Sequence, residues 1–131
     1  METELKRISD TRNIPADLVI TYDDMHGLWG GTTITICGDG HMERRTQQIS
    51  VAEIDITQTQ IDQPSLLKLI DLLITLTAWE QVTPDDMLLP DESRAHLTIS
   101  VNGYTSNMWE RFNEMATNNR LSQIRRRLDG L

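Results

Sequence analysis

One aliphatic stretch, residues 64–79, constrains the fold of this chain more than any other part of the sequence. On a helix, Lys68, Asp71 and Thr75 fall three or four positions apart and form one narrow polar stripe. Leucine and isoleucine cover most of the remaining circumference, so most of the helix surface has to be buried. Because a membrane span takes about 20 apolar residues, this shorter stretch predicts a core helix, with Pro64 in its first turn.

The length of 131 residues fits one domain with a real hydrophobic core. We expect an N-terminal arm or short helical turn over residues 1–16 and a single domain over residues 17–131. The net charge of −8 disfavours nucleic acid as a partner, because phosphates repel an acidic surface. Cys37 is the only cysteine, which excludes an internal disulfide. Without an apolar run near Met1 to suggest a signal peptide, we expect a cytoplasmic protein that does not bind membranes.

Alternating apolar and polar residues predict the strands of this chain. The sequence Gly38-Asp39-Gly40 between two of them is typical of a hairpin turn. Residues 49–56 either continue the strand before them or form a separate one, because the isoleucines change parity near Ala52. The expected strands are residues 17–23, 32–37, 41–46, the uncertain 49–56, and 95–101, where the alternation is strongest.

The sequence Asn102-Gly103 is a strong hairpin signal and predicts which residues face each other. A two-residue turn there pairs Val101 with Tyr104, Ile99 with Ser106, Leu97 with Met108, and His96 with Trp109. The spacing of Trp109, Phe112, Met115 and Ala116 then predicts a helix, and Leu121, Ile124 and Leu128 predict a last one. The expected fold class is α+β: an antiparallel sheet of four to six strands packed on one long apolar helix (64–79), with a C-terminal helix or helix pair.

Two loops contain apolar residues that turns do not require. A loop with three nearby glycines contains Met25, His26, Leu28 and Trp29, and an acidic loop at 80–93 contains Met87, Leu88 and Leu89. These side chains either fold back onto the core or form exposed anchors of the kind that dominate protein interfaces. If both loops project from one edge of the sheet, they form a single contact surface.

Residues able to perform catalysis are few and lack a diagnostic spacing. His26, His41 and His96 could join nearby acids in a metal site, but their spacing matches no strong metal motif. Cys37 and His41 form a possible thiol–imidazole pair, without a visible orienting group or oxyanion site. Arginines at positions 125–127 contact an anionic partner, match the acidic segment 80–93, or face solvent. We therefore expect no cofactor and no resident metal.

The order of elements resembles that of the emfourin-type proteins, small bacterial α+β inhibitors of thermolysin-like metalloproteases. The similarity covers residues 17–128: a strand leading into Gly30-Gly31, a second strand at 32–37, an aliphatic helix ending near Trp79, an acidic loop, a hairpin at 95–109 and a closing helix. The strand material at 43–56 and the Asn102-Gly103 turn depart from the family pattern. The resemblance implies an inhibitor whose loop beside the two glycines meets the protease, and it transfers no specific inhibitory residue.

Three functions remain open from the sequence. The first is a non-enzymatic protein-interaction domain, inhibitor-like in its mode, that binds through residues 25–29 and extends its contact to 87–89. The second is a small hydrolase or metal-binding protein that uses His26, His41 or Cys37. The third is a homo-oligomeric structural protein in which the apolar loops or an edge strand pair with a second copy.

Overall fold

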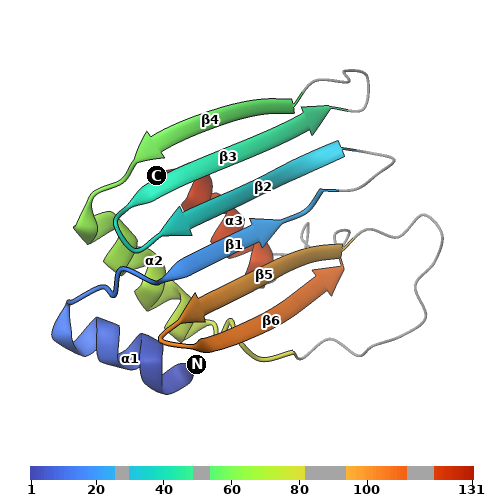
Figure 1. Ribbon diagram of the computed structural model, residues 1–131. Coiled ribbons are helices and arrows are strands. Elements are labelled where there is room, and N and C mark those ends of the chain that lie inside the picture. The colour runs from blue at the N-terminus through green and yellow to red at the C-terminus, as the bar shows by residue number, and fades with distance from the viewer. Residues whose placement is uncertain (26–29, 49–53, 82–93, 112–119) are drawn as a thin grey trace.

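Figure 1 shows a computed structural model of the chain, which describes residues 1–25, 30–48, 54–81, 94–111 and 120–131. Strands dominate the first half of the chain, and two of the three helices follow them. The elements in order are α1 (Glu2–Thr11), β1 (Val19–Asp23), β2 (Gly30–Cys37), β3 (His41–Gln48), β4 (Ile54–Gln60), α2 (Gln63–Thr75), β5 (Arg94–Val101), β6 (Tyr104–Arg111) and α3 (Arg120–Asp129).

All six strands belong to one antiparallel sheet, in the order β4-β3-β2-β1-β5-β6. The α+β class with an antiparallel sheet is therefore confirmed. Strand β1 lies inside the sheet because it pairs with β2 on one side and with the distant β5 on the other. Short hairpins connect β2 to β3 and β5 to β6, whereas α2 lies in the long connection that links edge strand β4 to β5 (Figure 1).

The β5–β6 hairpin has the register that the sequence predicts. Val101 faces Tyr104, Leu97 faces Met108 and His96 faces Trp109 across the Asn102-Gly103 turn. The predicted helix start at Trp109 is wrong, because β6 continues to Arg111. The helical spacing misled because Trp109 is half-buried beside the exposed His96 and does not belong to a helix face. Residues 112–119 lie outside the described residues.

The helix expected over 64–79 is shorter in the structure and is one of three short helices in the described part of the chain. It begins at Gln63, where the Asp62 carboxylate accepts a hydrogen bond from the Ser65 N–H at 2.9 Å. It ends at Thr75, since Thr77 adopts a φ of 47°, a left-handed conformation that stops an α-helix. The packing of the sheet on one long helix is thus not confirmed.

The helices α2 and α3 cover one face of the sheet, behind the strands in Figure 1, while α1 packs against α2 at one corner. Residues 1–16 contain more than the expected arm or short turn: α1 has ten residues, and its Leu5 is 0% exposed. The core joins the sheet face to the apolar sides of the helices. Its fully buried large side chains include Tyr22, Leu5, Leu18, Ile20, Ile34, Ile36, Leu66, Leu69, Ile70, Leu73, Leu97 and Ile99, together with Met108, Leu121, Ile124 and Leu128.

Strand β4 resolves the ambiguity about residues 49–56. Residues 49–53 lie outside the described residues, and a separate strand begins at Ile54 and continues to Gln60. The sequence predicts only its beginning, because every residue of β4 is exposed and the strand has no buried face to produce an apolar alternation.

Candidate functional site

The candidate site is the end of the sheet from which residues 26–29 leave β1 and return to β2. Met25 is half-buried directly after β1. Strand β5, which follows the second candidate loop, begins at the same end of the sheet, since Arg94 lies beside the end of β1 (Figure 1). The other predicted contact residues lie outside the described residues: His26, Leu28, Trp29, Met87, Leu88 and Leu89.

Two consecutive aspartates hold the ends of the 26–29 segment. The Asp23 carboxylate accepts hydrogen bonds from the Met25 N–H at 2.8 Å and from the Thr33 hydroxyl at 3.2 Å. On the opposite side of the strand, the Asp24 carboxylate accepts from the Thr32 N–H at 2.6 Å, and the Asp24 N–H donates to the Thr32 carbonyl at 3.0 Å. These hydrogen bonds connect the residues before the segment, Asp23 and Asp24, to the residues at the start of β2, Thr32 and Thr33.

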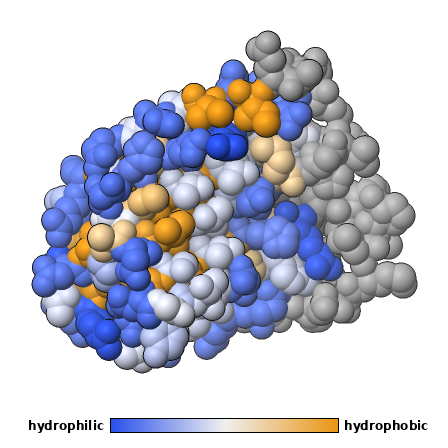
Figure 2. All heavy atoms as spheres, in the orientation of Figure 1, coloured by the Kyte–Doolittle hydropathy of each residue, from blue (hydrophilic) through white to orange (hydrophobic). Residues whose placement is uncertain are grey.

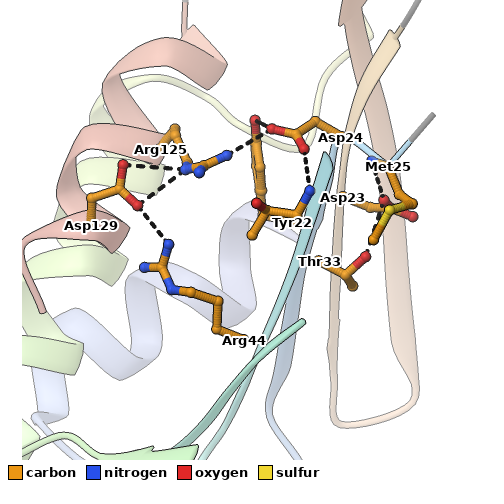
Figure 3. Close-up of polar contacts among 9 residues, drawn as sticks. Tyr22, Asp23, Asp24, Met25, Thr33, Arg44, Arg125 and Asp129 are labelled. Atoms are coloured by element: carbon orange, nitrogen blue, oxygen red, sulfur yellow. Dashed lines mark hydrogen bonds and ion pairs between the residues drawn. The ribbon is translucent and has the colours of Figure 1, made fainter. Parts of the chain in front are cut away.

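Asp24 is also the centre of a buried polar network (Figure 3). Asp24 is 5% exposed, and its carboxylate accepts hydrogen bonds from the Tyr22 hydroxyl and from the Arg125 guanidinium, both at 2.7 Å. The guanidinium carbon of Arg125 lies 5.5 Å from the centre of the Tyr22 ring, a cation–π distance. Helix α3 is thus joined to the end of β1 by a charged contact from which water is largely excluded.

The network continues from Arg125 to a third strand. Asp129, one turn later on α3, accepts hydrogen bonds from Arg125 at 3.1 Å and from Arg44 of β3 at 2.8 Å. Arg44 also donates to the Leu128 carbonyl at 3.3 Å, close to the C-terminus of the helix, where a cation is favoured by the helix dipole. Figure 3 shows these side chains converging between α3 and the sheet.

Burial and charge set the protonation states in this network. Burial, followed by hydrogen bonding to the Asp24 carboxylate, raises the pKa of Tyr22 above its ordinary value of 10.0. Burial opposes ionisation of Asp129, but the hydrogen bonds from Arg44 and Arg125 outweigh it and lower the pKa of Asp129. Burial likewise opposes the charge of Arg125, and its anionic neighbours raise the pKa of Arg125 nonetheless. At neutral pH the phenol is therefore neutral, whereas Asp129 and Arg125 are charged.

The two glycines at the start of β2 allow this close packing. Gly31 has a φ of 146°, and a Cβ there would lie 2.5 Å from the Asp24 carbonyl oxygen and 2.8 Å from the Met25 Cα. Gly30 has a φ of 76°, and a Cβ there would lie 2.1 Å from the Gln47 carbonyl oxygen. Both positions therefore require glycine for two reasons: a Cβ would clash with the neighbouring backbone, and the positive φ is unfavourable for other residues.

Beside the hydrogen-bonded ends of the 26–29 segment lies the sheet face that the helices leave uncovered. Figure 2 shows it as mainly hydrophilic, with one apolar patch along β4 and a second toward the left of the view. Threonines at positions 21, 35 and 98 form its central row through the strand registers. Asp23 and Glu43 lie on this face, and so do Arg45 and Arg94, so the face contains basic as well as acidic residues although the whole chain carries −8.

Of the described residues that could support catalysis, Cys37 and His41 lie opposite each other next to the Ile36–Met42 pair, whereas His96 is three strands away from His41. Cys37 ends β2 and His41 begins β3 across the hairpin, and His96 is exposed on β5; His26 lies outside the described residues. Among the described residues, no group of three or more His, Cys, Asp or Glu side chains could hold a metal ion. Surface cavities of about 470 and 380 Å³ lie elsewhere, the larger between α2 and α3 beside Lys68, Arg126 and Arg127.

The Asp24 network was not predicted from the sequence. A signal for it exists, because Ile20, Tyr22 and Asp24 share one parity, so the aspartate belongs to the buried side of its strand. Arg125 is assigned by the sequence to the polar sides of the last helix, yet its side chain is 26% exposed and ion-paired. Burial of a charge on an amphipathic helix depends on tertiary packing and has no local pattern.

Comparisons with known proteins do not assign the chain to a family. No protein-family model matches the sequence, and no curated protein matches it. Over the described residues, no helix has both the length and the hydropathy needed to cross a membrane.

Proposed function

We propose that this protein is a non-enzymatic protein-interaction domain that presents residues 25–29 to a protein partner from a rigid base. The observation that carries the proposal is the buried Asp24–Arg125 ion pair, with a 2.7 Å contact directly beneath the two ends of that segment. A buried ion pair adds little net stability compared with apolar residues of the same volume. Its position is better explained by the need to hold the segment in one place.

A fixed base favours binding because it lowers the entropy lost when a loop is ordered by its partner. The segment contains His26, Leu28 and Trp29, and tryptophan is among the residues enriched in interface hot spots. Next to the segment, the open face contains basic as well as acidic residues, so a protein surface can approach it without facing only acidic charge. These features favour a protein over a nucleic acid as the partner.

An inhibitor-like mode follows from the resemblance to emfourin-type proteins and belongs to the same proposal. In that mode the 25–29 segment occupies the substrate cleft of a thermolysin-like metalloprotease, and residues 87–89 extend the contact. Inhibitory loops bind well when their ends are held by the scaffold, which is the role assigned here to Asp23 and Asp24.

Photo-crosslinking from defined positions tests the proposal. A photoreactive amino acid at Leu28 should give a covalent adduct with the partner protein. Unlabelled wild-type chain should compete with formation of this adduct, whereas a Trp29→Glu chain should not. The same amino acid at Lys68, exposed on α2, is the matched control and should not give that adduct. Identical adducts from both positions, or equal competition by the Trp29→Glu chain, would contradict the proposal. Inhibition of purified thermolysin, measured in parallel, tests the inhibitor-like mode separately.

A further inference from the structure

The outer edge of β4 is an unprotected strand edge. All seven of its residues are exposed, so neither face of the strand is covered. Its outer side pairs with no strand of the described residues. Ile54 and Ile56 are 47% and 52% exposed and supply the apolar patch along β4 in Figure 2. Lysine and proline, two residues that commonly protect strand edges from pairing, are absent from this seven-residue strand, and Asp55 is its only charged residue.

The opposite edge of the sheet is protected in a specific way. The side-chain amide of Gln81 accepts a hydrogen bond from the Trp109 N–H at 2.8 Å and donates one to the Trp109 carbonyl at 3.1 Å. Gln81 therefore occupies the outward backbone groups of β6 as a neighbouring strand would. Stacking of the Arg94 guanidinium on the Trp109 ring, 3.6 Å from its centre, covers the same end of the strand. The two edges of this sheet are thus built differently.

The hydrogen-bond pattern identifies which groups of β4 are free to pair. The Ile61 N–H donates to the Gly40 carbonyl at 2.9 Å, which makes these two residues a hydrogen-bonded pair. Because such pairs alternate along an antiparallel ladder, the next ones are Thr59 with Met42 and Thr57 with Arg44. The backbone groups that point outward therefore belong to Ile54, Ile56, Gln58 and Gln60.

We propose that β4 pairs antiparallel with β4 of a second copy of the chain, about a two-fold axis at Thr57, to form a continuous twelve-stranded sheet. In this register all seven residues are paired. Ile54 faces Gln60 of the second copy, Ile56 faces its Gln58, Asp55 faces its Thr59, and Thr57 faces Thr57.

Charge and shape favour a second copy in this register. Asp55 is the only charged residue of β4 and meets a threonine hydroxyl, so no like charges face each other although each chain carries −8. Shifting the axis to Asp55 would place two carboxylates opposite one another. The isoleucines at 56 from the two copies become diagonal neighbours, about 7–8 Å apart, and cover each other from water. Since both faces of β4 are exposed, the helical layer leaves room for the added strand.

The solution mass and an edge-specific variant test the pairing. The wild-type chain should have twice its 15.0 kDa monomer mass at high concentration. Ile56→Pro removes an outward N–H without removing a bond to β3, so it should restore the monomer mass while the circular dichroism spectrum is kept. Asn107→Pro, at an outward position of β6, is the matched control and should remain dimeric. A monomeric wild type, or an Ile56→Pro chain that stays dimeric, would overturn the proposal.

Cysteine crosslinking tests the register. In a Cys37→Ser background, Thr57→Cys should form an intermolecular disulfide on oxidation, because Cα atoms directly opposite in a non-hydrogen-bonded pair lie about 4.5 Å apart. Thr59→Cys changes the same residue type on the same face, but the two cysteines would lie four positions apart along the strand, about 13 Å. Equal crosslinking from both positions would refute the two-fold axis at Thr57. Dimer formation does not depend on the proposed function, because photo-crosslinking at Leu28 and mass measurement report on different surfaces.

Discussion

Replacing Asp24 by alanine removes the acceptor at the centre of the buried network. Three donors lose this acceptor: the Thr32 N–H, the Tyr22 hydroxyl and the Arg125 guanidinium. Breaking a buried ion pair on one side costs about 3–5 kcal/mol, and we expect the lower end, about 3 kcal/mol. The reason is that Arg125 keeps Asp129 as a partner, and its side chain is 26% exposed, so water can solvate part of the charge. Asp24→Asn keeps an oxygen acceptor and should cost less.

Urea unfolding followed by far-ultraviolet circular dichroism measures this loss as a change in the free energy of unfolding. A double-mutant cycle with Arg125→Met isolates the pair, and a favourable coupling above about 1 kcal/mol is expected for residues in direct contact. Lys6→Met is the matched control, because the Lys6–Glu2 ion pair is more than half exposed on both sides and should contribute less than about 1 kcal/mol. A loss below about 1 kcal/mol for Asp24→Ala, or zero coupling to Arg125, would refute the importance of the buried pair.

Three further predictions concern the backbone, the phenol and the core. Gly31→Ala should lower the unfolding temperature more than Gly103→Ala, since only the first introduces a Cβ into occupied space; equal shifts would contradict this. In a Tyr104→Phe chain, phenolate absorbance should stay absent above pH 10.0 until the fold is lost. Because the folded pKa of Tyr22 is raised, its contribution to stability is complete below that pH and decreases as the pH rises further; ionisation without unfolding would argue against its burial. Leu69→Ala should cost about 2–5 kcal/mol in urea unfolding, as Leu69 is 0% exposed.

The strands that bury one side could be predicted from the sequence. Alternation along residues 95–101 and the Asn102-Gly103 turn together specify both strands of the last hairpin and their register. Only the first residues of β4 were predicted, because burial, the cause of alternation, is missing there: Ile54 and Ile56 are exposed. The full length of helix α1 was not predicted for a related reason: Leu5 and Ile8 alone provide too short a pattern to distinguish a packed helix from an arm.

The candidate site was predictable only in part. The position of Met25 just past a strand follows from local pattern. The requirement for glycine at 30 and 31 does not, because the atoms that a Cβ would meet there belong to Gln47, Asp24 and Met25. The pairing of Asp24 with Arg125 does not, because it joins residues at opposite ends of the chain and depends on how α3 meets the sheet. Long-range charge pairs leave no periodic trace in a sequence.

The position of β1 between β2 and β5 has a consequence for how the chain acquires its structure during synthesis. Strands β1 to β4 can pair as a local meander once they leave the ribosome, since each follows its neighbour in the sequence. The apolar side of that meander stays uncovered until α2, β5 and α3 have been made, because β1 must wait for β5 to pair on its other side. Such late pairing between strands distant in the sequence slows folding and leaves an aggregation-prone intermediate with exposed apolar surface. Translation pauses or truncations between β4 and β5 should therefore be the points at which this protein aggregates or recruits chaperones.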